Sequence, residues 1–167
     1  MKRQYPVFFA LILLAQIILA NFLNLGAYIA LSFLPVLILS LPVKYKAPAV
    51  MLIAFGAGFA ADFLSNGVLG LSSLAILPVA LAKEWLISLI FGSELRSRGE
   101  HISTRRQGVP KMSLALLIFT ALFFAVYVPA DVAGTRPAGF IALRWLLSTI
   151  VSTGVQVFLL RLLSEEE

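Results

Sequence analysis

The sequence predicts an all-α integral membrane protein, a single domain over residues 1–167 folded as a bundle of six transmembrane helices. Hydrophobic residues make up 60% of the chain and charged residues only 13%, whereas an average soluble domain is about 45–50% apolar and about 25% charged. Several apolar runs are also long enough to cross a hydrocarbon core, which takes about 17–25 residues. Strand-like alternation is absent from these runs, and a helix satisfies its own backbone hydrogen bonds in lipid.

The expected spans follow the apolar runs in chain order. They are residues 5–23, 28–41, 47–64, 68–91, 112–130 and 140–163. The first has no clear cleavage site of small residues and further spans follow it, so we interpret it as an uncleaved helix rather than a signal peptide. The second is the shortest and contains Pro35. Because membrane helices tolerate proline better than soluble ones, we expect a kinked or tilted helix there.

The distribution of basic residues predicts the orientation of the bundle. If the six helices alternate and the N-terminus is cytoplasmic, ten of the thirteen Lys and Arg residues lie inside. These are Lys2, Arg3, Lys44, Lys46, Arg96, Arg98, Arg105, Arg106, Lys111 and Arg161. Only Arg136 falls in an outer loop, while Lys83 and Arg144 fall within spans. This asymmetry obeys the positive-inside rule, places both termini in the cytoplasm and favours six spans over five.

The segment 92–111 is the only long connection, and it is polar and basic. Its basic residues are interpreted first as an orientation signal that also contacts anionic lipid headgroups, at about 1 kcal/mol each. The alternative is a docking site for a cytoplasmic partner. The lone histidine, His101, lies here without a second histidine or a carboxylate pair at metal-ligand spacing, which argues against a metal site or a histidine-activated nucleophile.

Other patterns of enzymes and nucleic-acid binders are also missing from the sequence. There is no phosphate-binding loop of the Walker type, and the basic segment has no interleaved aromatic residues. We therefore expect no enzymatic activity, no cofactor and no nucleic-acid partner.

Two ionisable residues at membrane depth are the main candidates for a functional site. Asp62 lies at the end of the third span, and Arg144 lies near the same end of the sixth. Because charges in a membrane are costly, they are usually paired or functional. We predict that Asp62 and Arg144 form an ion pair. The alternative is that Arg144 extends alone to the headgroups and Asp62 is solvated.

Arg144 also begins a polar stripe, with Ser148, Ser152 and Gln156 at four-residue spacing. This spacing places the four side chains on one helix face. We expect that face to point inward and to make interhelical hydrogen bonds worth about 0.6 kcal/mol per contact, in preference to lining a substrate pathway.

Lys83 lies near the inner end of the fourth span and has two possible placements. Either one helix continues to Phe91 while the Lys83 side chain extends to the headgroups, or the helix leaves the membrane at Lys83 and continues along the interface with Trp85. The sequence does not decide between them.

Small residues at four-residue spacing characterise the third span. The pairs are Ala54/Gly58, Gly56/Ala60 and Ala57/Ala61. Such spacing lets another helix backbone approach closely, and within one chain we expect this to be intramolecular packing.

The region around these residues resembles a known family, the bacterial rod shape-determining protein MreD. The pattern consists of Phe55, Gly58, Phe59, Asp62, Phe63, Asn66, Gly70 and Leu71, after Leu34-Pro35 and Leu41-Pro42 and before Lys83. The chain departs from it at Ser72, where histidine is expected, and at Val36, where an acidic residue often stands. From the residues and the resemblance together, the structural or partner-binding candidates are Gly56, Gly58, Asp62, Asn66, Gly70, Lys83 and Arg144.

The resemblance implies a non-enzymatic scaffold of the cell-wall elongation complex in the bacterial inner membrane. Its implied partners are an MreC-like single-span protein, an MreB-like filament, a RodA-type polymerase and a transpeptidase. The family fold is similar to the substrate-binding components of energy-coupling-factor transporters, which makes a carrier of a small vitamin-like solute the rival interpretation. Such a carrier needs a cavity with convergent polar groups, and the short outer loops offer few. A membrane enzyme acting on lipid-linked precursors would need paired carboxylates or a surface histidine.

Overall fold

The computed structural model describes residues 5–22, 26–65, 68–92 and 108–165, and within these ranges all of its regular structure is helical. The helices are α1 (Tyr5–Phe22), α2 (Leu34–Ser40), α3 (Ala47–Leu64), α4 (Leu71–Phe91), α7 (Val109–Val132) and α8 (Ala138–Glu165). The expectation of an all-helical protein is therefore confirmed for the described residues. The predictions that concern Asn66, His101 and the basic segment 93–107 lie outside them.

Four of these helices, α3, α4, α7 and α8, are each long and apolar enough to cross a membrane. Helix α1 contributes a shorter apolar stretch, Phe9–Ile18. Together they suggest a multi-pass membrane protein. Of the two placements considered for Lys83, the continuous one is observed, because α4 runs as one helix to Phe91.

The predicted helix over residues 28–41 is wrong in its first half. Helix α2 spans only Leu34–Ser40, and residues 29–33 before it have no helical structure. Pro35 lies in the first turn of α2. Proline has no N–H to donate, disfavours helical geometry in the residue before it and is well suited to the first turn of a helix. The proline therefore starts this helix instead of kinking it.

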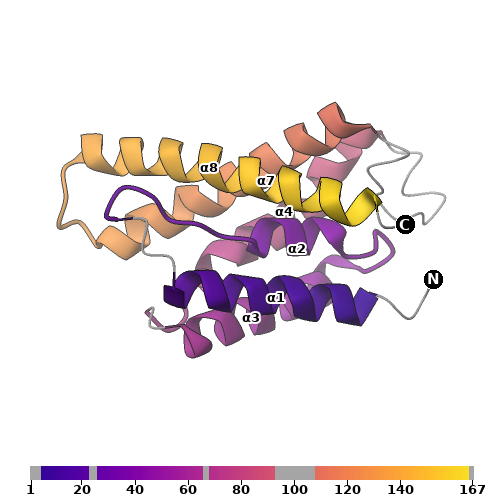
Figure 1. Ribbon diagram of the computed structural model, residues 1–167, viewed down its shortest axis with the longest axis horizontal. Coiled ribbons are helices and arrows are strands. Elements are labelled where there is room, and N and C mark those ends of the chain that lie inside the picture. The colour runs from indigo at the N-terminus through magenta and orange to yellow at the C-terminus, as the bar shows by residue number, and fades with distance from the viewer. Residues whose placement is uncertain (1–4, 23–25, 66–67, 93–107, 166–167) are drawn as a thin grey trace.

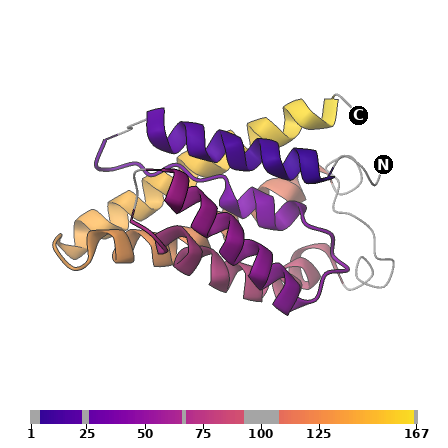
Figure 2. The ribbon, with the colours of Figure 1, turned by 90° about the horizontal axis from the view of Figure 1, so that it is seen from below.

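The short helix α2 lies at the centre of the bundle. In Figure 1 it is seen between α1 and α8, and Figure 2 shows it surrounded by longer helices in the perpendicular view. The side chains of Val36, Leu37, Ile38 and Leu39 are fully buried. The most extensive helix packing joins α3 to α4, α4 to α7 and α7 to α8. An apolar core thus surrounds α2 on several sides.

Small residues let α3 and α4 approach closely, as the spacing predicts, but only on one face of α3. A Cβ atom added to Gly58 would lie 2.7 Å from the Cα and backbone N of Ser73. The neighbouring Ala54, Ala57 and Ala61 are buried on the same side. Gly56, in contrast, is exposed and has open space around it. The prediction that Gly56 takes part in a close contact between helices is therefore wrong.

Candidate functional site

The polar stripe of α8 binds the backbone of the non-helical segment 29–33. We call Ser148, Ser152 and Gln156 the polar ladder. The Ser148 hydroxyl accepts a hydrogen bond from the Ala30 N–H over 2.9 Å. The Ser152 hydroxyl accepts from the Ser32 N–H and donates to the Ala30 carbonyl, both over 3.3 Å. The Gln156 amide nitrogen donates to the Ser32 carbonyl over 2.6 Å.

The geometry of the ladder follows from two backbone spacings. Four residues along an α-helix rise by about 6 Å, and two residues along an extended chain advance by about 6.5 Å. Side chains at positions i, i+4 and i+8 of α8 can therefore bind the polar groups of alternate residues, Ala30 and Ser32, one after the other. The prediction that this face points inward is confirmed, since Ser148, Ser152 and Gln156 are all fully buried. Most of its partners are backbone groups of segment 29–33, and the predicted bonding to another helix occurs between Gln156 and Thr120 of α7.

Two further buried side chains complete the site, and sequence reasoning missed both. Gln16 of α1 accepts a hydrogen bond from the Phe33 N–H over 2.5 Å. Thr120 of α7 donates its hydroxyl hydrogen to the Gln156 side-chain oxygen over 3.2 Å. The signal for Gln16 was present, because it is the only polar residue between Val7 and Ala20. Side chains from α1 and α8 thus bind one short stretch of chain, and Thr120 of α7 supports Gln156.

These contacts explain how an irregular segment can lie inside a membrane domain. Lipid offers no hydrogen bonds, so non-helical backbone at membrane depth must be buried in protein and satisfied there. The seven residues of α2 rise by about 10 Å, and residues 29–33 can add up to about 17 Å. Together they approach the roughly 30 Å thickness of a hydrocarbon core. The polar ladder supplies the hydrogen bonds that this segment would otherwise lack.

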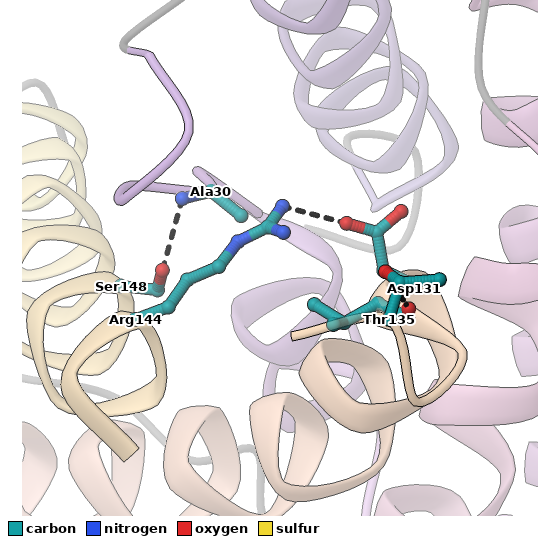
Figure 3. A network of polar contacts seen from close by, with 6 residues as sticks. Ala30, Asp131, Thr135, Arg144 and Ser148 are labelled. Atoms are coloured by element: carbon teal, nitrogen blue, oxygen red, sulfur yellow. Dashed lines mark hydrogen bonds and ion pairs between the residues drawn. The ribbon is translucent and has the colours of Figure 1, made fainter. Parts of the chain in front are cut away.

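Arg144 pairs with Asp131, so the predicted pair of Arg144 with Asp62 is wrong. The Arg144 guanidinium lies 2.6 Å from the Asp131 carboxylate, one turn of α8 before the bond between Ser148 and Ala30 (Figure 3). Asp131 belongs to the last turn of α7, where the sequence had suggested a loop. The C-terminal ends of α3 and α7 lie at the same end of the bundle (Figure 1). The charged groups therefore gather at one end of the bundle, as expected, with a different partner for the arginine.

Asp62 instead caps the start of α4. Its carboxylate accepts a hydrogen bond from the Ser72 N–H over 2.9 Å, and its side chain is buried. The first N–H groups of a helix have no partner within the helix, and a negative charge there is favoured by the helix dipole. Gly70 immediately precedes α4 with φ +87°, a conformation that glycine adopts at low cost. Asp62 and Gly70 therefore shape the connection between α3 and α4.

Lys83 is buried, so its side chain does not extend to the headgroups as one of the two possible placements had it. Only 2% of the residue is exposed, and its ammonium donates to the Leu41 carbonyl over 2.8 Å. Leu41 directly follows α2. Carbonyl groups at a helix C-terminus lack partners within the helix, and cations are favoured there. Lys83 thus fixes the C-terminal end of α2, while the polar ladder and Gln16 fix the segment that leads into its N-terminal end.

The outward face of α3 carries a row of stacked aromatic rings, which we call the α3 aromatic face. It consists of Phe55, Phe59 and Phe63, with Leu52 one turn before them. The ring centroids of successive phenylalanines are 6.1 and 6.4 Å apart. All four side chains are exposed. The three aromatic residues that carry the resemblance to MreD therefore point away from the core.

A hollow on the described surface lies elsewhere, between α7 and α8. Its volume is about 280 Å³, and it is lined by Ala125, Pro129, Ala138, Ile141, Ala142 and Trp145. None of these side chains carries a charge. In the described part of the chain, no three His, Asp or Glu residues are grouped so that they could hold a metal ion. The polar ladder and this hollow are therefore separate features.

Comparison with known proteins adds no relative, since no family model, curated protein or solved structure matches the chain.

Proposed function

We propose that this chain is a non-enzymatic scaffold of the cell-wall elongation complex in the bacterial inner membrane. The proposal takes its biological role from the resemblance of residues 34–83 to MreD. In this role the chain binds the transmembrane helix of an MreC-like single-span protein. It also acts with an MreB-like filament, a RodA-type polymerase and a transpeptidase.

The α3 aromatic face is the observation that carries this proposal. Phe55, Phe59 and Phe63 stack in one row and pack against no other part of the described chain closely enough to be buried. Aromatic residues are enriched where one protein binds another, because they offer a large rigid contact area. Gly56 lies exposed beside this row, and a Cβ atom added to it would have no neighbour within 4 Å. A partner helix could approach the α3 backbone at this position.

The polar ladder weighs against the rival role as a solute carrier. A solute site needs several polar groups that converge on a cavity. Here Ser148, Ser152 and Gln156 are fully buried and bonded to the chain's own segment 29–33. The hollow between α7 and α8 is lined by residues without charge. The polar side chains that could have served a solute are thus engaged in the fold.

The proposal includes a topology of six crossings with both termini in the cytoplasm. Four crossings correspond to the long apolar helices, and α1 provides a fifth. Segment 29–33 and α2 together provide the remaining one, with the chain changing from irregular to helical inside the membrane. The distribution of Lys and Arg supports the orientation.

Affinity purification from bacterial membranes tests the proposal. A photo-crosslinking amino acid is placed at Phe59 in one sample and at Leu146, an exposed position on α8, in a matched control. We expect a single-span protein to copurify and to crosslink at position 59 much more than at position 146. A tightly bound small solute in the purified chain, with no protein partner, would contradict a scaffold role. Equal crosslinking at both positions would exclude the α3 aromatic face as the binding surface.

A further inference from the structure

Segment 29–33 has two edges, and the polar ladder binds only one of them. The N–H and C=O groups of Ala30 and Ser32 all form hydrogen bonds with side chains of α8. In an extended chain the backbone groups of alternate residues point to opposite sides. Phe33 follows this alternation, because its N–H donates to Gln16 of α1 instead of to α8. The segment therefore has the bonding pattern of a strand with one edge on α8.

The other edge of the segment is unpaired at Ile29 and Leu31. The alternation directs their N–H and C=O groups to the same side as the Phe33 N–H. Within the part of the chain that the structure describes, no group forms a hydrogen bond with the backbone of either residue. Both residues are half-buried, so neither is sealed inside the core. Because lipid offers no hydrogen bonds, two unpaired residues at membrane depth require a partner from outside the chain.

This unpaired edge lies near one end of the bundle. The ring of Tyr28, the residue before Ile29, packs on the ring of Phe140 with centroids 5.1 Å apart. Phe140 belongs to the first turn of α8, beside the connection from α7. Figure 1 shows the segment entering between α8 and α1 at this end. A chain that pairs with the edge here lies close to the membrane boundary, where water can satisfy its own outer edge.

The chemistry of the edge determines what kind of partner fits it. Ile29 and Leu31 each offer one donor and one acceptor, and the two residues are about 6.5 Å apart along an extended chain. A transmembrane helix uses its own backbone groups internally and cannot pair with them. The headgroup of phosphatidylcholine has acceptors but no donor for the two carbonyls. Another extended chain supplies donors and acceptors at the same spacing, as in the addition of a strand to a sheet edge.

We propose that the edge formed by Ile29 and Leu31 binds an extended segment of a partner protein through backbone hydrogen bonds. The inference requires only that segment 29–33 is docked on α8, and it is independent of the proposed role in cell-wall elongation. It also concerns a different surface from the α3 aromatic face, which would bind a helix.

Hydrogen–deuterium exchange resolved to single amides tests the proposal. The full chain is exchanged in native membrane vesicles and, after purification, in phosphatidylcholine vesicles that contain no other protein. We expect the amides of Ile29 and Leu31 to exchange at least about tenfold more slowly in the native vesicles, because a hydrogen bond must open before an amide exchanges. The amides of Ala30 and Ser32 serve as internal controls, since α8 binds them in both samples.

Two variants distinguish strand pairing from simple coverage of the edge. Ile29→Pro removes one donor and should return the Leu31 amide to fast exchange in native vesicles, whereas Ile29→Ala keeps the donor and should leave Leu31 protected. Neither change removes a group that is bonded to α8.

Three results would overturn the proposal. Fast exchange of Ile29 and Leu31 in native vesicles would show that the edge is hydrated. Equal protection of both amides in phosphatidylcholine vesicles would assign the shielding to lipid. Protection of Leu31 that persists in Ile29→Pro would show that a partner covers the edge without pairing to it as a strand.

Discussion

The side-chain amide of Gln156 donates to the carbonyl of Ser32 over 2.6 Å, and 124 residues of sequence separate the two. Gln156 is itself held by Thr120. Through this bond α8 satisfies a backbone group of the irregular segment that leads into α2. The contact links the polar stripe of α8 to the non-helical segment 29–33. The stripe is visible in the sequence, whereas the break in helical structure is not.

Replacing Gln156 with leucine should destabilise the protein by about 1–3 kcal/mol, because the buried Ser32 carbonyl then lacks a donor. Thermal unfolding in detergent measures this loss. The matched control is Val155→Leu, since Val155 is an exposed neighbour on the same helix and should change stability by less than about 0.5 kcal/mol. Equal stability of the two variants would show that the ladder does not hold the segment.

The ion pair of Arg144 with Asp131 should appear as an energetic coupling in a double-mutant cycle. We expect Arg144→Gln and Asp131→Asn to couple by about 1–2 kcal/mol, as residues in direct contact do. The parallel cycle of Arg144→Gln with Asp62→Asn should be additive within about 0.5 kcal/mol. Chemical unfolding of the variants provides both values, and a larger coupling to Asp62 would restore the pair predicted from the sequence.

Two glycines on α3 should respond in opposite ways to alanine. Gly58→Ala places a Cβ against the backbone of Ser73, so the helices must separate, at about 1–3 kcal/mol. Gly56→Ala meets open space and should be neutral or stabilise the helix by up to about 1 kcal/mol. Unfolding measurements on both variants compare them directly. A similar loss of stability in both variants would contradict the close contact between α3 and α4.

Lys83 should be replaceable by a donor but not by an apolar residue. Lys83→Met leaves the Leu41 carbonyl without its partner and should cost about 1–3 kcal/mol. Lys83→Gln keeps a neutral donor and should cost less. The melting temperatures of the two variants rank them, and a methionine variant at least as stable as the parent would show that the bond to Leu41 contributes nothing.

The long helices could be predicted from the sequence because each has an apolar run that lipid or core must cover. The bounds of α3 agree with the prediction to the residue. The polar stripe on α8 was also visible, since four-residue spacing alone places its members on one face. Local patterns of this kind do not depend on where the rest of the chain lies.

The partners of the polar residues could not be predicted, because they depend on tertiary packing. Residues 28–41 are apolar enough for a helix. The irregular segment within them is stable because side chains of α1 and α8 form hydrogen bonds with its backbone groups. Asp62 and Arg144 were placed correctly at one end of the bundle, but Asp131 was assigned to a loop. An error of two residues at the end of α7 thus concealed the true partner of Arg144.

Crosslinking in native membranes tests most directly whether segment 29–33 is docked on α8. The chain has no cysteine, so Ala30→Cys with Ser148→Cys introduces one pair without background, and Ala30→Cys with Ile150→Cys is the control, because Ile150 is exposed. A protease site inserted between α4 and α7 reports the crosslink, since linked fragments stay together. We expect a short thiol crosslinker to join residues 30 and 148 but not residues 30 and 150. Failure to join 30 and 148, or equal joining of both pairs, would contradict the account.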